Sequence, residues 1–124
     1  MTVAEEAFSY KKLAELAALE LQLIRAQKEC VNSWCSTDFG WIMLLDLYLA
    51  ERNSLPTQTT YLIEQSGASR ATGLRILKRL EEEELIRRFQ RNSDAKSKFI
   101  ELSAKGRQSL DTYLVTAFTA LRDL

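Results

Sequence analysis

The feature that most restricts the fold is a pair of short helical stretches separated only by residues 66–69, with the sequence SGAS. Thr57 is a suitable N-cap for the first stretch, and Gly67 is a suitable C-terminal stop. Ser69 is expected to cap the second stretch, which should continue to about Glu83. Two helices joined by such a short turn containing glycine are typical of a helix-turn-helix.

The spacing of apolar residues indicates which sides of these two helices are buried. Leu62 and Ile63 are the expected buried positions of the first helix. The apolar stripe of the second helix is formed by Gly73 or Leu74, together with Leu77, Leu80 and Ile76. Its open face carries four basic side chains, Arg70, Arg75, Lys78 and Arg79.

After the second helix, the apolar period changes from helical to two. Residues 85–90 and 98–102 alternate in the manner of strands, and the polar segment 91–97 between them contains the turn formers Asn92, Ser93 and Asp94. This pattern predicts a β-hairpin with a basic tip, which is a wing. The fold class is therefore expected to be mainly α with a small β-hairpin, a winged helix-turn-helix.

Three further helices are expected around this centre. The first should run over residues 2–29, with a capping box formed by Thr2 and Glu5. The second, over residues 39–52, is apolar on nearly every side and is expected in the middle of the core. The last should follow a cap at Ser103. We expect one domain over residues 1–124, with dimerisation helices in 1–36 and 103–124 and a DNA-binding part in 37–102.

Both terminal helices carry apolar seams that step by three and four residues. A single small chain offers too little surface to cover both seams, so they predict a homodimer. The expected dimerisation residues are Ala7, Tyr10, Ala14, Ala17, Leu21 and Ile24 in the first helix and Leu110, Leu114, Ala117 and Leu121 in the last.

Charge is balanced over the whole chain, which has 17 basic and 17 acidic residues, but not along it. Residues 68–98 contain nine basic and five acidic side chains, and four of the acids are consecutive, at positions 81–84. The basic side chains predict a surface that binds the phosphates of double-stranded DNA, although a solvated helix also carries such residues. The residues predicted to contact DNA are Thr57, Gln58 and Thr59 in the first helix, Ser69, Arg70, Ala71, Thr72, Arg75, Lys78 and Arg79 in the second, and Arg91, Lys96 and Lys98 on the hairpin.

Other function classes find little support. The chain has no histidine, no glycine-rich phosphate loop and no cluster of metal ligands, so we expect no enzyme, catalytic residue, cofactor or metal. The apolar run 41–50 is short and contains Asp46, so no membrane span is expected. The first residues lack a signal-peptide pattern, and two cysteines in such a chain are expected to be reduced, which predicts a cytoplasmic location.

Three segments together resemble the multiple-antibiotic-resistance regulator (MarR) family of winged-helix transcription factors. Residues 69–75 (SRATGLR) resemble the start of the family's recognition helix, residues 80–86 (LEEEELI) resemble its end, and DAK at 94–96 followed by LSAKG at 102–106 resembles its wing. The resemblance implies a homodimer with interlocking terminal helices. It also implies that the recognition helix, 69–84, enters the major groove and that the wing, 85–102, meets the flanking minor groove.

The sequence departs from the family pattern at two positions. Lys96 stands where the family usually has arginine. A guanidinium can form two hydrogen bonds to one partner, whereas the ammonium of lysine is a point charge. Glu84 stands where glycine usually ends the recognition helix in a left-handed conformation, so a glutamate is expected to adopt that conformation here.

Four questions remain open from the sequence. A winged helix can also serve as a protein–protein interaction module without DNA binding. Trp34, Phe39, Trp41 and Tyr48 suit either core packing or a pocket for a small aromatic effector. Tyr61 suits either a phosphate contact or a cover for the core. Cys30 and Cys35 suit either a redox switch or unreactive thiols.

Overall fold

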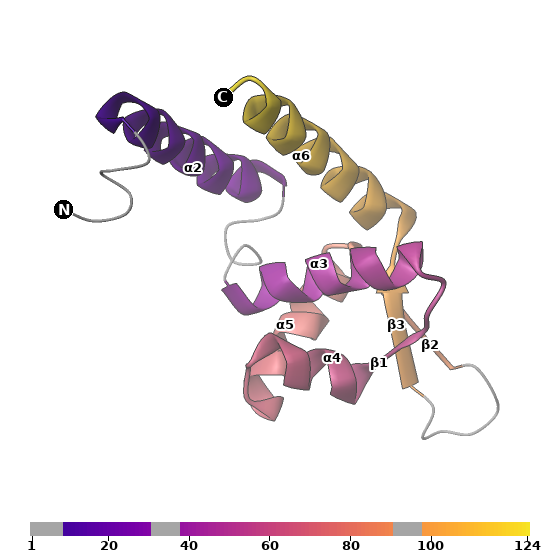
Figure 1. The fold of residues 1–124 in the computed structure, drawn as a ribbon. Helices are drawn as coiled ribbons and strands as arrows, with labels where there is room; N and C mark the ends of the chain where they lie inside the picture. Colours follow the sequence, from indigo (N-terminus) through magenta and orange to yellow (C-terminus); the bar gives the residue numbers. More distant parts are fainter. Residues whose placement is uncertain (1–8, 31–37, 91–97) are drawn as a thin grey trace.

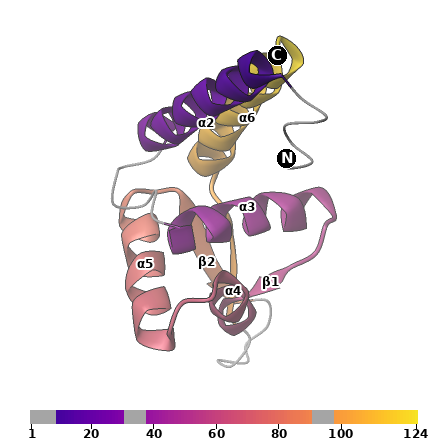
Figure 2. The ribbon, with the colours of Figure 1, turned by 60° about the vertical axis from the view of Figure 1, so that its left-hand side comes forward.

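The computed structural model describes residues 9–30, 38–90 and 98–124. The elements, in chain order, are α2 (Tyr10–Cys30), α3 (Asp38–Arg52), β1 (Thr57–Gln58), α4 (Thr59–Ser66), α5 (Arg70–Glu82), β2 (Ile86–Gln90), β3 (Lys98–Leu102) and α6 (Ala104–Arg122). In Figures 1 and 2, α2 and α6 lie side by side as an upper layer, and α3 separates them from α4, α5 and the strands. The predicted fold class, mainly helical with a small β-structure, is confirmed.

The β-structure is larger than predicted. Instead of a two-stranded hairpin, the chain forms a three-stranded antiparallel sheet in the order β1-β3-β2, in which Thr57 is opposite Ile100. Thr57 was expected to cap α4, but it lies in β1, and Gln58 takes the cap position without a side-chain hydrogen bond. A β-branched residue suits a strand, and β1 covers an edge of β3 that would otherwise be unpaired.

The helix-turn-helix forms as expected. Gly67 ends α4 in a left-handed conformation with φ 85°. Ser69 caps α5, because its Oγ accepts a hydrogen bond from the Thr72 N–H at 3.1 Å. Gly73 is buried where α5 crosses α4, and a Cβ at this position would lie only 2.5 Å from Ile63 Cγ2. A glycine is therefore required for the two helices to pack this closely.

The core lies beneath α3 and combines apolar side chains from every layer. Met43, Leu44 and Leu47 of α3 are buried, so α3 lies in the core as expected, but Ile42 and Leu49 are exposed and the helix is not covered on every apolar side. The reason is that α3 packs on α4, α5 and β3 with one side and on α6 with another, which leaves a third side open. The remaining core residues include Leu62, Ile63, Ile76, Leu77, Leu80, Leu85, Ile86, Ile100, Leu102 and Leu110.

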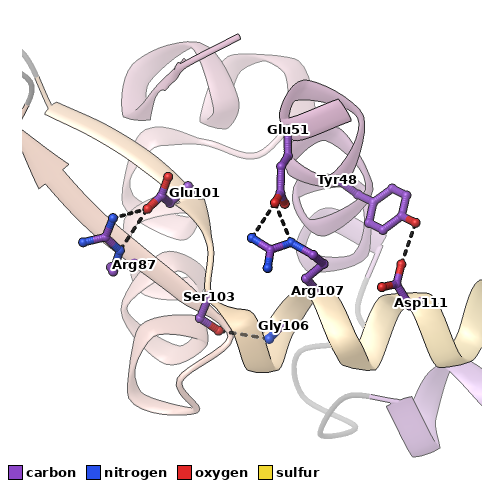
Figure 3. A network of polar contacts seen from close by, with 8 residues as sticks. All are labelled: Tyr48, Glu51, Arg87, Glu101, Ser103, Gly106, Arg107 and Asp111. Carbon is purple, nitrogen blue, oxygen red and sulfur yellow. Dashed lines mark hydrogen bonds and ion pairs between the residues drawn. The ribbon is translucent and has the colours of Figure 1, made fainter. Parts of the chain in front are cut away.

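Polar contacts join α6 to α3 (Figure 3). The Tyr48 hydroxyl donates a hydrogen bond to Asp111 Oδ1 at 2.6 Å, and Arg107 forms an ion pair with Glu51. Ser103 caps α6 as predicted, since its Oγ accepts a hydrogen bond from the Gly106 N–H at 2.9 Å. These contacts attach the first half of α6 to the DNA-binding part that was predicted from the sequence.

The first described helix is α2. Ser9 Oγ accepts a hydrogen bond from the Lys12 N–H at 3.2 Å, and α2 begins at Tyr10, while residues 2–8 of the expected helix lie outside the described residues. The capping box predicted for Thr2 and Glu5 lies outside the described residues. The helix runs antiparallel to α6, because Lys12 Nζ donates to the Leu124 carbonyl oxygen while Cys30, at the other end, contacts Ser109.

Cys30 is packed in this α2–α6 contact. Its Sγ donates a hydrogen bond to the Ser109 carbonyl oxygen at 3.1 Å, and burial raises the pKa of the thiol. A raised pKa suppresses the thiolate, which is the reactive form. The environment of Cys30 therefore favours the unreactive alternative, and Cys35 lies outside the described residues.

The C-terminus of α5 has the predicted left-handed glutamate. Glu84 has φ 62°, and the N–H groups of Glu84 and Leu85 donate to the carbonyl oxygens of Glu81 and Leu80, both at 3.0 Å. This is the Schellman arrangement, in which glycine is the preferred residue at the left-handed position. A residue with a Cβ is strained in this conformation.

Replacing Glu84 by glycine should therefore stabilise the protein. We expect Glu84→Gly to raise the free energy of unfolding by about 1 kcal/mol and the melting temperature by roughly 3–5 °C. The control is Glu82→Gly, two residues earlier at the last residue of α5, which should lower stability because glycine is unfavourable within a helix. A melting temperature that stays the same or falls in Glu84→Gly would contradict the strain.

The state of Cys30 can be tested in a Cys35→Ser variant, in which it is the sole thiol. Because its pKa is raised, less thiolate is present at any given pH, and at about pH 8 it should react with an alkylating reagent more slowly than a peptide thiol. As the pH is raised further, the alkylation rate of Cys30 should still increase where the alkylation rate of the peptide thiol has become constant. Unfolding in urea should restore the peptide rate, whereas a fast reaction in the folded protein would show an activated thiol.

Candidate nucleic-acid interface

One side of α5 faces solvent along its length. Ala71, Arg75 and Lys78 are all exposed, and their spacing of four and three residues places them on one side of the helix. We call these three residues the α5 outer face. The buried residues Gly73 and Leu77 lie on the opposite side. The contact of Gly73 with α4 therefore determines which residues α5 presents outward.

The cations nearest the N-terminus of α5 are not neutralised by acids. Arg70, Arg75 and Lys78 form no ion pair with any carboxylate in the segments that the structure describes. The same holds for Lys98 at the start of β3. These four positively charged groups remain available to an anionic partner.

The other basic residues of this region have acidic neighbours. Arg79 pairs with Glu83 at 3.2 Å, and Arg88 of β2 pairs with Glu81 at 3.6 Å. Two of the four consecutive glutamates, Glu81 and Glu83, therefore hold arginines. The α5 cations that no carboxylate of the described residues pairs with are consequently Arg70, Arg75 and Lys78.

The described part of the wing is held by cross-strand contacts. Arg87 Nε donates to Glu101 Oε1 at 2.9 Å across β2 and β3 (Figure 3). The guanidinium carbon of Arg87 lies 5.6 Å from the centre of the Phe89 ring. Phe89 in turn stacks on Phe99 with ring centres 5.7 Å apart. Arg91 and Lys96, which were predicted to contact DNA, lie outside the described residues.

The residues predicted at the start of α4 divide into two groups. Thr57 is only 7% exposed and pairs within the sheet, so its side chain is unavailable to DNA and that assignment is not retained. Gln58 is exposed beside β3, and Thr59 Oγ1 donates to the Lys98 carbonyl oxygen at 3.5 Å. The start of α4 therefore lies next to Lys98, the first residue of β3, which we call the base of the wing.

Tyr61 is 57% exposed on α4, which favours a surface role over that of a core cover.

The elements of the candidate interface lie toward one side of the molecule. The turn between α4 and α5, with Ser69 and Arg70, lies on the side of the molecule farthest from α2 and α6 (Figures 1 and 2). The strands β2 and β3 extend toward the same side. An elongated anionic partner on this side would contact the first turns of α5 and the base of the wing together.

The aromatic residues considered for an effector pocket have separate environments. Trp41 is buried against Tyr113, edge to face, with ring centres 4.9 Å apart. Tyr48 is held by Asp111, and Phe39 is exposed. Core packing is thus the observed use of Trp41, and Trp34 lies outside the described residues.

The apolar seam predicted on the first helix is exposed in this chain. Ala7 lies outside the described residues, but every other member of the seam is exposed, namely Tyr10, Ala14, Ala17, Leu21 and Ile24. The opposite side of α2 packs inward through Leu19, which is buried, and Leu23, which is half-buried. The helix is therefore apolar on two sides, and only one of them is covered.

Most of the seam predicted on the last helix packs within the chain itself. Leu110 is buried in the core, and Leu114 and Ala117 pack partly buried against it, so these residues serve the fold of the chain itself. Of the predicted set, only Leu121 is exposed. The exposed apolar residues of α6 also include Val115 and Phe118, which were missed although their spacing of three residues from each other and from Leu121 is visible in the sequence.

Two further properties of the described segments bear on function. None of their helices combines the length and apolar character needed to cross a bilayer. Within the same segments, histidine, cysteine and acidic side chains form no group of three or more that could bind a metal ion.

Comparison with known proteins agrees with the geometry. The MarR family model matches residues 47–98, which extend from α3 to the start of β3. Among solved structures, MepR of S. aureus bound to ethidium bromide has a TM-score of 0.64 and 18% identity, over 95% of this chain and 81% of that chain. No curated protein matches the sequence.

Two other solved structures are equally similar in fold. MepR of S. aureus in its DNA-binding conformation has a TM-score of 0.62 and 20% identity, over 94% of this chain and 81% of that chain. NadR in complex with 4-hydroxyphenylacetate has a TM-score of 0.62 and 20% identity, over 94% of this chain and 82% of that chain. The matched segment agrees with the resemblance inferred from the sequence, and the solved structures show that this chain has a winged helix-turn-helix fold.

Proposed function

We propose that this protein is a transcriptional regulator that binds double-stranded DNA as a homodimer. The observation that carries the proposal is that Arg70, Arg75 and Lys78 of α5 form no ion pair with any carboxylate of the described residues, and that α5 begins at the end that points away from α2 and α6. MepR, which has the same fold, is a transcription regulator of a multidrug efflux pump. A helix-turn-helix reads DNA with the N-terminal residues of its second helix, and that is where Arg70 and Arg75 lie.

The proposed contacts follow from the position of each element. The α5 outer face would enter the major groove, where Arg75 can reach a base edge and Lys78 a phosphate. Gln58 and Thr59 at the start of α4 would contact the backbone beside the groove. The base of the wing, with Lys98, would approach the flanking minor groove.

The dimer would form through the apolar surfaces that the chain leaves uncovered. Five exposed residues of α2 follow a heptad-like spacing, and α6 adds Val115, Phe118 and Leu121 on its own open side. Phe118 is 68% exposed, which is unusual for a phenylalanine in a monomer. A second copy would bury these surfaces and present two α5 helices on one duplex.

The proposal includes no effector. MepR with ethidium bromide and NadR with 4-hydroxyphenylacetate show that this fold can accommodate aromatic molecules. Of the aromatic side chains first considered for such a pocket, those that the structure describes do not converge, since Trp41 packs on Tyr113 and Phe39 faces solvent.

Assembly can be tested on α2. The wild type should sediment as a dimer at micromolar concentration, and a Leu21→Glu/Ile24→Glu variant should be monomeric or aggregated, because charges would replace an apolar contact. Gln22→Glu/Lys28→Gln makes the same change in net charge at two exposed positions of α2 outside the seam, and it should remain dimeric. A wild type that sediments as a stable 14.2 kDa monomer would refute the dimer.

DNA binding can be tested by comparing a duplex selected from a random pool with unselected DNA. Arg70→Ala or Arg75→Ala should each weaken binding to the selected duplex by about 1–3 kcal/mol and relax base preference. Lys98→Ala should weaken binding to both DNAs alike and reduce the salt slope by about one unit. Arg122→Ala, at the end of α6, is the matched control and should bind normally.

The rival function predicts a different pattern. If the fold were a protein–protein interaction module, neither DNA would bind in a salt-dependent manner, and the arginine variants would behave like wild type. Full affinity and preference in both Arg70→Ala and Arg75→Ala would show that α5 is not the helix that reads DNA.

A further inference from the structure

Two arginines of α5 are held by neighbours on the same helix, but the neighbours differ in kind. Arg79 is paired with the carboxylate of Glu83, which lies toward the C-terminus of the helix. Arg75 Nη2 donates a hydrogen bond to Thr72 Oγ1 at 3.3 Å, and Thr72 lies toward the N-terminus. A carboxylate cancels the charge of the arginine that it holds, whereas a hydroxyl is neutral. Arg75 is therefore oriented and keeps its charge.

Thr72 is itself well fixed. Its backbone N–H is bound by Ser69 Oγ at 3.1 Å, and its side chain is half-buried and β-branched, so few rotamers are open to it. Ser69, Thr72 and Arg75 follow one another at intervals of three residues, and hydrogen bonds join each to the next. The cap of the helix is thus connected to a side chain of the α5 outer face.

This contact leaves most of the guanidinium free. An arginine has five N–H donors, and the Thr72 hydroxyl accepts one of them. Guanine presents two acceptors, O6 and N7, in the major groove, and arginine binds both with a forked pair of hydrogen bonds. The group that Thr72 holds can still form such a pair, and it leans toward the end of α5 that the proposed complex places deepest in the groove.

We propose that Thr72 is a positioning residue that orients Arg75 to read a guanine. The inference rests on the proposed function, because it requires α5 to enter the major groove. An arginine that is already oriented loses less conformational freedom on binding, which increases affinity. This increase depends only on the base pair that Arg75 contacts. Phosphate contacts elsewhere are unaffected by it.

The test selects duplexes of about 30 base pairs from a random pool with wild type and four variants: Arg75→Lys, Thr72→Val, Thr72→Ser and the double variant Thr72→Val/Arg75→Lys. Wild type should show a guanine preference at one position of each half-site. Arg75→Lys should remove it, because an ammonium cannot make the forked pair. Thr72→Val, which lacks the hydroxyl, should weaken the same preference by roughly 3- to 10-fold, and Thr72→Ser should retain it.

The double variant separates positioning from direct contact. If Thr72 acts through Arg75, Thr72→Val should have no further effect once Arg75 is lysine. The salt slope should be equal in all of these proteins, because each keeps its charge. Thr112→Val makes the same substitution on α6 and should leave the preference intact, and melting temperatures confirm that each variant is folded.

Two results would overturn the inference while leaving DNA binding in place. In the first, Thr72→Val alters a different base pair from Arg75→Lys, which would show that Thr72 contacts a base itself. In the second, Thr72→Val keeps the full preference that Arg75→Lys loses. If the wild type selects no duplex at all, the proposed function fails and the inference fails with it.

Discussion

The contact between Gly73 and Ile63 is the constraint on which the rest of the arrangement depends. With no Cβ at position 73, α5 packs directly on the side chain of Ile63 in α4. This contact sets both the distance between the two helices and the rotation of α5 about its own axis. Because one side of α5 is committed to Ile63, the side with Ala71, Arg75 and Lys78 must face solvent. A packing requirement thus determines which residues are offered to a partner.

The second determinant is the pairing of charges. The chain is neutral as a whole, yet it has a basic surface, because its acids are placed beside particular arginines. Glu83 holds Arg79 and Glu101 holds Arg87, while the partner of Arg75 among the described residues is the neutral Thr72 hydroxyl. Net charge would have argued against a nucleic-acid partner, whereas the local distribution argues for one.

Local signals in the sequence predicted the helix-turn-helix well. Ser69, Gly67 and Ser103 act through backbone contacts within three residues, so their roles can be read without knowing the fold. The left-handed conformation of Glu84 was likewise predicted, through the family resemblance. The strand β1 was missed because a two-residue strand has no periodicity, and it exists only because β3 offers an edge.

Tertiary relationships were predicted less well. Leu110 and Phe118 are both apolar residues of an amphipathic helix, but Leu110 packs in the core of its own chain and Phe118 is exposed. Spacing alone shows that a helix has an apolar face, and it does not show whether the same chain or a partner covers that face. The pair Arg88–Glu81 joins β2 to α5 and could not be seen before the strand was placed on the helix.

Hydroxyl-radical footprinting of the wild-type protein on a duplex selected from a random pool would show whether two copies of this chain present two α5 helices to one duplex. A dimer bound in this way should give two equally protected stretches whose centres lie about 10 base pairs, or a multiple of that distance, apart. A single protected stretch at saturating protein, or uniform protection of any sequence, would contradict it.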